Sequence, residues 1–404
     1  MKKFLPWIFL VLFGGCLLTG CVKRTPPPAW ISKILMMNQP IGEEEIFILP
    51  EGDKISFGEL IDDLNTTRVI FVGETHDRIE HHQIQVNVVQ GLLRNGKEVV
   101  IAMEMFERSQ QPILDRWSQG LLTEEEFLNE VKWETTWGMD YNLYRGILDE
   151  IRDRPLKVLG LNIERDLVRK VAQHGMEGLS HEDKEKFPGM DLTDRQHRRY
   201  IASIYKSHPG GSAKDFEKFY EAQCLWDEAM AETLSQFLQS PGGKGKTVLV
   251  FAGSGHVAFD FGIPKRFYRR TSLPYKTIVL KEWRKKIEDE LTSAGTSSPL
   301  GNFLWITKPA PPEKKRPRMG VVLKEKEHPK GLWIEKVISE SPAEKAGLLP
   351  GDQLIAVEGK EITKVKDIHD ALSEKGWGKD VNVTIIRDGL KKEITVTLSP
   401  PPDY

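Results

Sequence analysis

Cysteine is scarce in this sequence, and neither sign of charge predominates. The 404 residues include 3 cysteines, and 57 Lys and Arg stand against 59 Asp and Glu, so the formal net charge is -2. This balance excludes a general electrostatic attraction to nucleic acid, and we expect no nucleic-acid partner. A hydrophobic fraction of 39% beside 29% charged residues excludes a polytopic membrane protein, a collagen and a wholly disordered chain. A chain of this length predicts two or three globular domains.

The longest uncharged apolar run lies at the start of the chain, from Phe4 to about Gly20. Two lysines precede it, so residues 1–20 have the pattern of a secretory signal peptide. The run ends in Leu18-Thr19-Gly20-Cys21, which resembles a bacterial lipobox. Cys21 is then the first mature residue and carries acyl chains such as palmitate, which hold the protein to a membrane. An uncleaved signal anchor is the alternative.

The lipobox resemblance also implies a location for the protein. Val22 rather than an Asp follows Cys21, and in Gram-negative lipoproteins this implies export and anchoring at the periplasmic face of the outer membrane. Residues 21–45, which include three consecutive prolines, are expected to form a tether. Removal of Cys16 with the signal peptide leaves Cys224 as the single free thiol, so no internal disulfide is expected.

Residues 46–300 alternate short apolar runs with longer amphipathic stretches, which predicts an α/β fold with a mostly parallel sheet and flanking helices. The polar stretch near residues 180–212 contains proline and glycine and predicts a helical insertion. The expected strands are residues 68–72, 98–106, 157–161, 247–251 and 275–280, and the clearest expected helices are residues 83–94, 123–131 and 215–237.

A second change in composition begins near Pro309. Residues 301–317 are rich in proline and basic residues and are expected to form a linker. Residues 318–400 alternate short β patterns with turns and contain one clear helix, residues 365–373. This pattern predicts a small, separate, β-rich domain.

Polar side chains follow the expected strands where these end. Glu74 and His76 follow the first, Glu104 lies at the end of the second, and His256 follows the fourth. Both histidines belong to a G-x-x-H pattern placed directly after a strand. Because the carboxyl ends of parallel strands form one edge, we expect these side chains to share a site. His76, Glu104 and His256 are candidate ligands of a divalent transition metal such as Zn, and the alternative is that the histidines cap helices or satisfy buried backbone groups.

Two further segments bear on such a site. Gln223 and Asp227 lie one turn apart on the apolar stripe of residues 215–237, so they either face the site or lie at the solvent edge of the stripe. The aromatic segment 133–144 includes Tyr141 and Tyr144, which either line a pocket for a flat ligand such as haem or belong to the core or a dimer contact. The other histidines lie in polar stretches and receive no role. Cys224 is expected to be a buried structural thiol.

The first domain resembles the ChaN-like haem-binding uptake lipoproteins of the Tiki and erythromycin-esterase superfamily. The resemblance rests on residues 72–77, 103–106 and 252–257, and on Gln223, Trp226, Asp227 and Met230. It implies an outer-membrane lipoprotein that binds haem for iron acquisition, with haem held partly by tyrosine and often between two protomers, hence a possible homodimer. The haem-binding candidates are Glu74, His76, Glu104, Tyr141, Tyr144, Gln223, Asp227 and His256, with Tyr268 a further candidate ligand.

The Tiki branch implies an alternative function. In that branch the histidines of the G-x-x-H motifs and a glutamate form the site of a metal-dependent protease. His76 and His256 match the ligands here, and Glu104 matches a ligand or a general base. The alternative function is therefore a metal-dependent hydrolase.

Residues 341–355 resemble the short helix and turn of bacterial PDZ domains. Met319, Gly320, Val321 and Val322 occupy the place of the carboxylate-binding loop. The resemblance implies that a C-terminal or internal peptide of an envelope protein binds as an added strand beside residues 321–323. A scaffold whose first domain has lost its chemistry would keep only this function.

Overall fold

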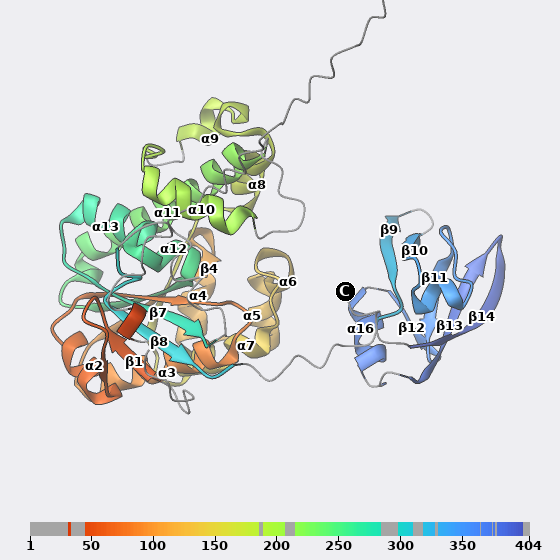
Figure 1. Cartoon of the computed structure of the whole chain (residues 1–404), viewed down its shortest axis with the longest axis horizontal. Coiled ribbons are helices and arrows are strands. Elements are labelled where there is room, and N and C mark those ends of the chain that lie inside the picture. The colour runs from red at the N-terminus through yellow and green to blue at the C-terminus, as the bar shows by residue number, and fades with distance from the viewer. Residues whose placement is uncertain are drawn as a thin grey trace, which may run out of the picture. The chain divides into compact units, whose positions relative to one another are not determined.

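The computed structural model describes residues 31–33, 45–185, 189–206, 215–283, 298–309, 318–327, 330–363, 365–373, 375 and 378–398. The chain divides after Pro309 into two compact units, each with its own sheet (Figure 1). Cys21, the signal peptide, most of the expected tether and residues 310–317 of the expected linker lie outside the described residues. None of the described helices is long and apolar enough to cross a membrane.

The first unit is built on an eight-stranded sheet with the order β2-β1-β8-β7-β3-β6-β4-β5. The strands from β8 to β5 are parallel to one another, and β1 pairs antiparallel with both β2 and β8. The expected mostly parallel sheet is therefore confirmed. The strands are β1 (Glu45–Ile48), β2 (Asp53–Ile55), β3 (Val69–Glu74), β4 (Val99–Glu107), β5 (Lys157–Asn162), β6 (Thr247–Gly253), β7 (Lys276–Glu282) and β8 (Phe303–Thr307).

Helices cover both faces of this sheet, and alternate strand residues are buried against each layer. Val69 and Phe71 of β3 belong to one core cluster, and Ile70 and Val72 belong to the other. This is why the central strands are apolar throughout. The helices are α2 (Phe57–Leu64), α3 (Ile79–Arg94), α4 (Gln111–Ser118), α5 (Glu124–Glu130), α6 (Trp133–Thr136), α7 (Tyr141–Asp153), α8 (Arg165–His174), α9 (His181–Glu185), α10 (Arg195–Lys206), α11 (Phe216–Gln239), α12 (Ser254–Val257) and α13 (Ile263–Thr271).

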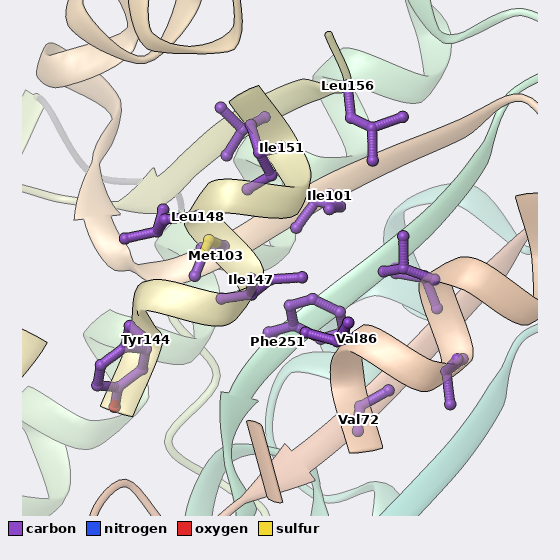
Figure 2. Packing of buried hydrophobic residues seen from close by; sticks show 14 of the residues in the cluster. Val72, Val86, Ile101, Met103, Tyr144, Ile147, Leu148, Ile151, Leu156 and Phe251 are labelled. Atoms are coloured by element: carbon purple, nitrogen blue, oxygen red, sulfur yellow. The ribbon is translucent and has the colours of Figure 1, made fainter. Parts of the chain in front are cut away.

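Helices α2 to α7 pack on one face and α10, α11 and α13 on the other. In Figure 2, Ile147 and Ile151 of α7 and Val86 of α3 approach Ile101 and Phe251 of the sheet. The expected helical insertion is present as α9 and α10, which lie with α8 at one side of the unit (Figure 1). The three expected helices are also present, as α3, α5 and α11.

The sheet extends further than the sequence predicted. β8 lies within residues 301–317, which were expected to be linker, and it is hydrogen-bonded to β7 and β1. The expected linker therefore begins too early. The five residues of β8 are all buried, and such a short apolar run carries no periodicity that separates a strand from a loop.

The second unit is an antiparallel sheet with the order β14-β13-β11-β10-β9, and β12 pairs with β11. Its core includes Leu332, Leu354 and Val383, and α16 contributes Ile368 and Leu372. The expected helix at residues 365–373 is present. The elements are β9 (Val321–Glu327), β10 (Lys330–Val337), α15 (Pro342–Lys345), β11 (Gln353–Val357), β12 (Lys360–Glu361), α16 (Val365–Ser373), β13 (Asp380–Arg387) and β14 (Leu390–Thr397).

Candidate functional site

The strand order brings three polar strand ends together. β6 lies between β3 and β4, and all three run in the same direction. Glu74 ends β3, Glu104 lies near the end of β4, and Gly253 ends β6. The residues that follow these strands therefore meet at one edge of the sheet, as expected for an open α/β fold.

The two G-x-x-H motifs fit against each other through their glycines. A methyl group on Gly73 would lie 3.1 Å from Cβ of Val257 and 3.3 Å from Cα of Ser254. A methyl group on Gly253 would lie 2.9 Å from Nε2 of His76. Each glycine thus leaves room for the turn of the other motif, and this close approach explains why both motifs begin with the residue that has no side chain.

Glu74 is the centre of the first half of the site. Its carboxylate is buried and accepts hydrogen bonds from Nδ1 of His76 at 2.8 Å and from the Tyr144 hydroxyl at 3.2 Å. Gln85 also donates to it, and Nε2 of His82 lies 3.2 Å away. Burial alone would raise the pKa of Glu74, but the hydrogen bonds from His76 and His82 hold it well below its usual value. Glu74 is therefore ionised at neutral pH.

Glu104 and Asp227 hold His256 from two sides. Nδ1 of His256 lies 2.7 Å from Oδ1 of Asp227, and Nε2 lies 3.4 Å from Oε1 of Glu104. Oε2 of Glu104 accepts a hydrogen bond from the backbone N–H of Gly253 at 2.7 Å. The Gln223 amide also contacts the His256 ring, 2.9 Å from Nδ1.

These contacts set the protonation of the pair. Burial opposes the charged form of His256, but Glu104 and Asp227 outweigh it and raise the pKa of His256 to about 10. Burial likewise opposes ionisation of Glu104, but the charge of His256 and its hydrogen bond lower the pKa of Glu104 to about 2. At neutral pH the site therefore contains an imidazolium between two carboxylates.

His76 links the two halves and is the accessible member of the set. Its side chain is 33% exposed, whereas those of Glu74, Glu104, Asp227 and His256 are all at most 8% exposed. Burial opposes its protonation, but the Glu74 hydrogen bond and the charge of Glu104 raise the pKa of His76. Its ring meets Trp137 edge to face, with 4.8 Å between the ring centroids. A ligand that approaches this edge therefore meets His76 and Trp137 first.

A second layer of buried groups supports Asp227. Nε2 of His197 lies 3.4 Å from Oδ2 of Asp227, and the Arg266 guanidinium lies 3.6 Å from the same oxygen. Arg266 also donates to Sγ of Cys224 at 3.3 Å. Cys224 is buried, as expected of a structural thiol.

Sequence reasoning assigned no role to His82 or His197, yet both are buried against site carboxylates. A signal for His197 was present. It shares the three-and-four spacing of the apolar stripe of α10 with Tyr200, Ile201 and Ile204.

The structure separates the candidate tyrosines. Tyr144 is fully buried and donates to Glu74, and Tyr141 is 8% exposed against Trp133. Burial raises the pKa of both phenols. Tyr268 is 52% exposed but packs on Tyr275, which precedes β7, at the opposite edge of the sheet.

Tyr205 is a tyrosine that sequence reasoning missed. It lies near the end of α10, is partly exposed, and packs against Phe216 and Phe219 of α11 with ring centroids 5.6 and 4.8 Å away. Its neighbour Ile204 lies 3.8 Å from the position of a methyl group on Gly255. The aromatic cluster of Tyr205, Phe216 and Phe219 therefore adjoins the turn that carries His256. Tyr205 lies in the segment that the sequence predicted only as a helical insertion, so it was not considered as a ligand.

The residues present do not fit a metal centre. Among the described residues, no group of three or more His, Cys, Asp or Glu side chains is arranged to hold a metal ion. Both ring nitrogens of His256 lie against carboxylates, and both oxygens of Glu104 are engaged by Gly253 and His256. The expectation of His76, Glu104 and His256 as metal ligands therefore gains no support.

In the second unit, the expected carboxylate-binding loop leads into the edge strand β9. Met319 is buried, Gly320 has a φ of 86°, and Val322 is 42% exposed. β9 pairs with β10 on one side and ends the order of strands on the other. The open side of β9 is where an extended peptide can add a strand.

Comparison with known families agrees with this architecture. Residues 60–267 match the family described as haem-binding uptake, Tiki superfamily, ChaN. The chain belongs to this ChaN family. Residues 317–398 match the PDZ domain, so the second unit is a PDZ domain. Both family matches confirm the resemblances predicted from the sequence motifs.

Individual relatives cover different parts of the chain. The structure of ChaN of Campylobacter jejuni, described as showing cofacial haem binding, covers 67% of this chain and 99% of that one, with a TM-score of 0.53 and 21% identity. At this identity the likeness shows a common ChaN fold. The protein RETICULATA-RELATED 5 of Arabidopsis thaliana is 21% identical over 267 residues, which are 61% of this chain and 35% of that protein.

The probable periplasmic serine protease do/HhoA-like of Haemophilus influenzae is 34% identical over 68 residues, which are 17% of this chain and 15% of that protein. The chain thus spans about a third and about a seventh of the length of these two relatives.

Proposed function

We propose that the α/β unit binds haem over the carboxyl edge of its sheet, beside α10 and the start of α11. One observation carries this proposal. Tyr205 is a partly exposed phenol within an aromatic cluster next to the turn of His256, whereas Tyr141, Tyr144, Tyr200 and Tyr220 are at most 8% exposed. Phenolate oxygen is an established ligand of ferric haem, and flat aromatic surfaces bury a porphyrin well. Membership of the ChaN family supports the same ligand.

In this proposal, each group has a defined task. Tyr205 would supply its phenolate oxygen to the iron, and the Phe216 and Phe219 rings would pack against the flat ligand. His76 and Trp137 lie on the exposed side of the same edge and limit how deep the ligand can sit. The Glu104–His256–Asp227 group does not contact iron. It fixes the turn that positions the edge.

Haem titration of the whole protein tests this proposal. Tyr205→Phe is expected to weaken haem binding by about tenfold or more, because it deletes the ligand oxygen and keeps the ring. The readout is the Soret band and the charge-transfer band of a phenolate-bound ferric haem. Tyr268→Phe is the matched control, since Tyr268 is exposed at the opposite edge. An unchanged spectrum for Tyr205→Phe, with loss of binding in His76→Ala, would assign the iron to His76 instead.

The haem proposal extends to a homodimer and to a role in iron acquisition. The structure described for the Campylobacter relative has haems face to face, and we infer a homodimer here that encloses two haems in the same manner, in the service of iron acquisition. Sedimentation with and without haem measures this. A protein that stays monomeric with one haem bound per chain would contradict the dimer and leave haem binding intact.

The PDZ domain is proposed to dock the end of an envelope protein. An extended peptide pairs with β9, and the backbone N–H groups of the loop at Met319 to Val322 receive its carboxylate. A peptide with an apolar C-terminal residue is expected to bind at least about tenfold more weakly when its carboxylate is amidated, because hydrogen bonds to a charged group are lost. Fluorescence anisotropy measures both peptides. Equal affinities would mean that the domain binds internal peptides.

Lipid anchoring at Cys21 completes the proposal. The lipobox motif supports it, and it places the haem site and the PDZ domain at the periplasmic face of the outer membrane. Cys21→Ser is expected to release the protein from the membrane fraction and to abolish palmitate labelling. Membrane retention of this variant would favour an uncleaved anchor.

A further inference from the structure

A second candidate site lies at the opposite edge of the α/β unit. A surface hollow of about 320 Å³ is lined by Asp260, Tyr268, Pro274, Tyr275 and Asn302. Pro274 and Tyr275 directly precede β7, and Asn302 directly precedes β8, so the hollow lies at the amino ends of these strands. His76, Glu104 and His256 follow the carboxyl ends. The hollow is therefore separate from the proposed haem site.

Asp260 gives this hollow its chemistry. Its Oδ1 is buried and makes no hydrogen bond within the described part of the chain. The nearby Thr277 hydroxyl is engaged with Asn302. It donates to Oδ1 of Asn302 at 3.3 Å and accepts from the backbone N–H of Asn302 at 3.0 Å. Burial raises the pKa of Asp260 to about 6, opposed only by Thr277, so the carboxylate is ionised above that pH. A carboxylate with one buried oxygen that has no hydrogen-bond partner is a costly feature.

The backbone adds a second unusual feature at the same place. Phe259 and Asp260 are consecutive non-glycine residues with φ of 59° and 60°. Non-glycine residues are strained in this conformation, and such conformations cluster at ligand-binding sites. The strained pair presents Asp260 to the hollow.

The neighbouring cations are paired elsewhere. Lys276 forms an ion pair with Asp63 at 3.1 Å, and Arg269 and Arg270 both pair with Glu228. No Lys or Arg is among the residues that line the hollow. The negative charge of Asp260 therefore meets no positive side chain of the hollow.

Aromatic rings form the rest of the wall. Tyr268 and Tyr275 meet edge to face, with 6.3 Å between centroids and 72° between planes. The Tyr268 ring is 52% exposed and is open to a ligand. Aromatic faces beside a carboxylate are the combination that recognises organic ammonium groups.

We infer that this hollow binds a small organic cation, of the quaternary or methylated ammonium class, between the Tyr268 and Tyr275 rings and the Asp260 carboxylate. The volume suits a small molecule. This inference is independent of haem binding, because none of its residues belongs to the haem edge.

The test uses two probes of the same shape. Choline and 3,3-dimethyl-1-butanol differ in that the quaternary nitrogen of the first is a neutral carbon in the second. Saturation-transfer NMR and calorimetric titration of the whole protein measure both. Choline is expected to bind at least about tenfold more tightly than the neutral probe. Equal binding of the two, or no binding of choline at millimolar concentration, would overturn the inference.

Three variants locate the binding. Asp260→Asn removes the charge, and because asparagine tolerates a positive φ at least as well as aspartate, the fold is expected to be kept. Tyr268→Ala removes an exposed ring. Each is expected to weaken choline binding by about fivefold or more without changing the Soret spectrum of bound haem. Asp166→Asn, which removes an exposed carboxylate on α8, is the control and should bind choline normally. Unchanged choline binding in Asp260→Asn would overturn the assignment.

Discussion

At the scale of single residues, His256 shows how the site is stabilised by charge. The imidazolium has a carboxylate on each side, and neither ring nitrogen is left without a partner. A buried charge is tolerated only when it is paired and hydrogen-bonded in this way. His81 and His197 have the opposite protonation state, because burial lowers the pKa of each to about 4.

These opposite shifts predict how stability depends on pH. His81 and His197 are neutral in the folded protein, so their contribution is complete above the unfolded pKa of 6.5 and is lost as the pH falls toward about 4. The pKa of His256 is raised, so its contribution is complete below 6.5 and is lost as the pH rises toward about 10. We therefore expect the free energy of unfolding to be greatest near pH 6.5. Urea unfolding across this range measures it.

Two variants separate the limbs of this profile. His256→Gln is expected to flatten the alkaline limb, and His197→Gln to reduce the slope of the acid limb. A stability that keeps rising from pH 7 to 9 in the natural protein would contradict the protonated state of His256.

At the scale of elements, the turns after β3 and β6 are matched parts of one structure. Gly253→Ala is expected to lower the free energy of unfolding by about 1–3 kcal/mol and to displace His76, because the new methyl group lies 2.9 Å from its ring. Urea unfolding and the NMR shifts of the His76 ring measure the two effects. Gly58→Ala in α2 is the control, since its methyl group has an ordinary contact at 3.8 Å.

The control variant should keep or raise stability by up to about 1 kcal/mol, because alanine favours a helix. If Gly253→Ala is as stable as the control, the close approach of the two G-x-x-H turns does not require a glycine at this position.

Most elements could be predicted because their periodicity is local. The apolar runs of β3 to β7 and the stripe of α11 needed no knowledge of the fold. The strand order could not be derived in this way, since it depends on pairing between distant segments. β1 and β8 were missed because both are short strands, and their pairing with each other joins the two ends of the first unit's sequence. The sequence analysis correctly placed His76, Glu104 and His256 at one edge of the sheet. The carboxyl ends of parallel strands share an edge whatever the order of the strands, so this prediction needed only the strand direction.

The partners of those residues were harder to predict. His82 lies in a polar stretch, and only the packing of α3 on the sheet buries it, whereas the apolar spacing of α10 gave a signal for His197 that was not used. The position of Tyr205 depends on how α10 packs over the β6 turn, which local sequence does not encode. A charged core network is in general visible only after the helices are placed.

At the scale of the whole molecule, the chain contains two units with separate cores. We expect two unfolding transitions, because each unit buries its own apolar residues. Removal of residues 310–404 should leave the transition of the α/β unit and its haem spectrum unchanged. Calorimetry of both forms measures this. A single transition in the full chain that shifts when the PDZ domain is removed would show that the units stabilise each other.

Cys224 gives a chemical means of following one helix in the intact protein. It lies within α11 with no exposed surface, and burial raises the pKa of its thiol to about 12, although Arg266 opposes this. A protonated, enclosed thiol does not react with alkylating reagents, whereas an opened helix exposes one that does. In a form whose Cys21 is acylated, the rate of alkylation therefore reports how often α11 separates from the sheet, even while the protein remains attached to a vesicle.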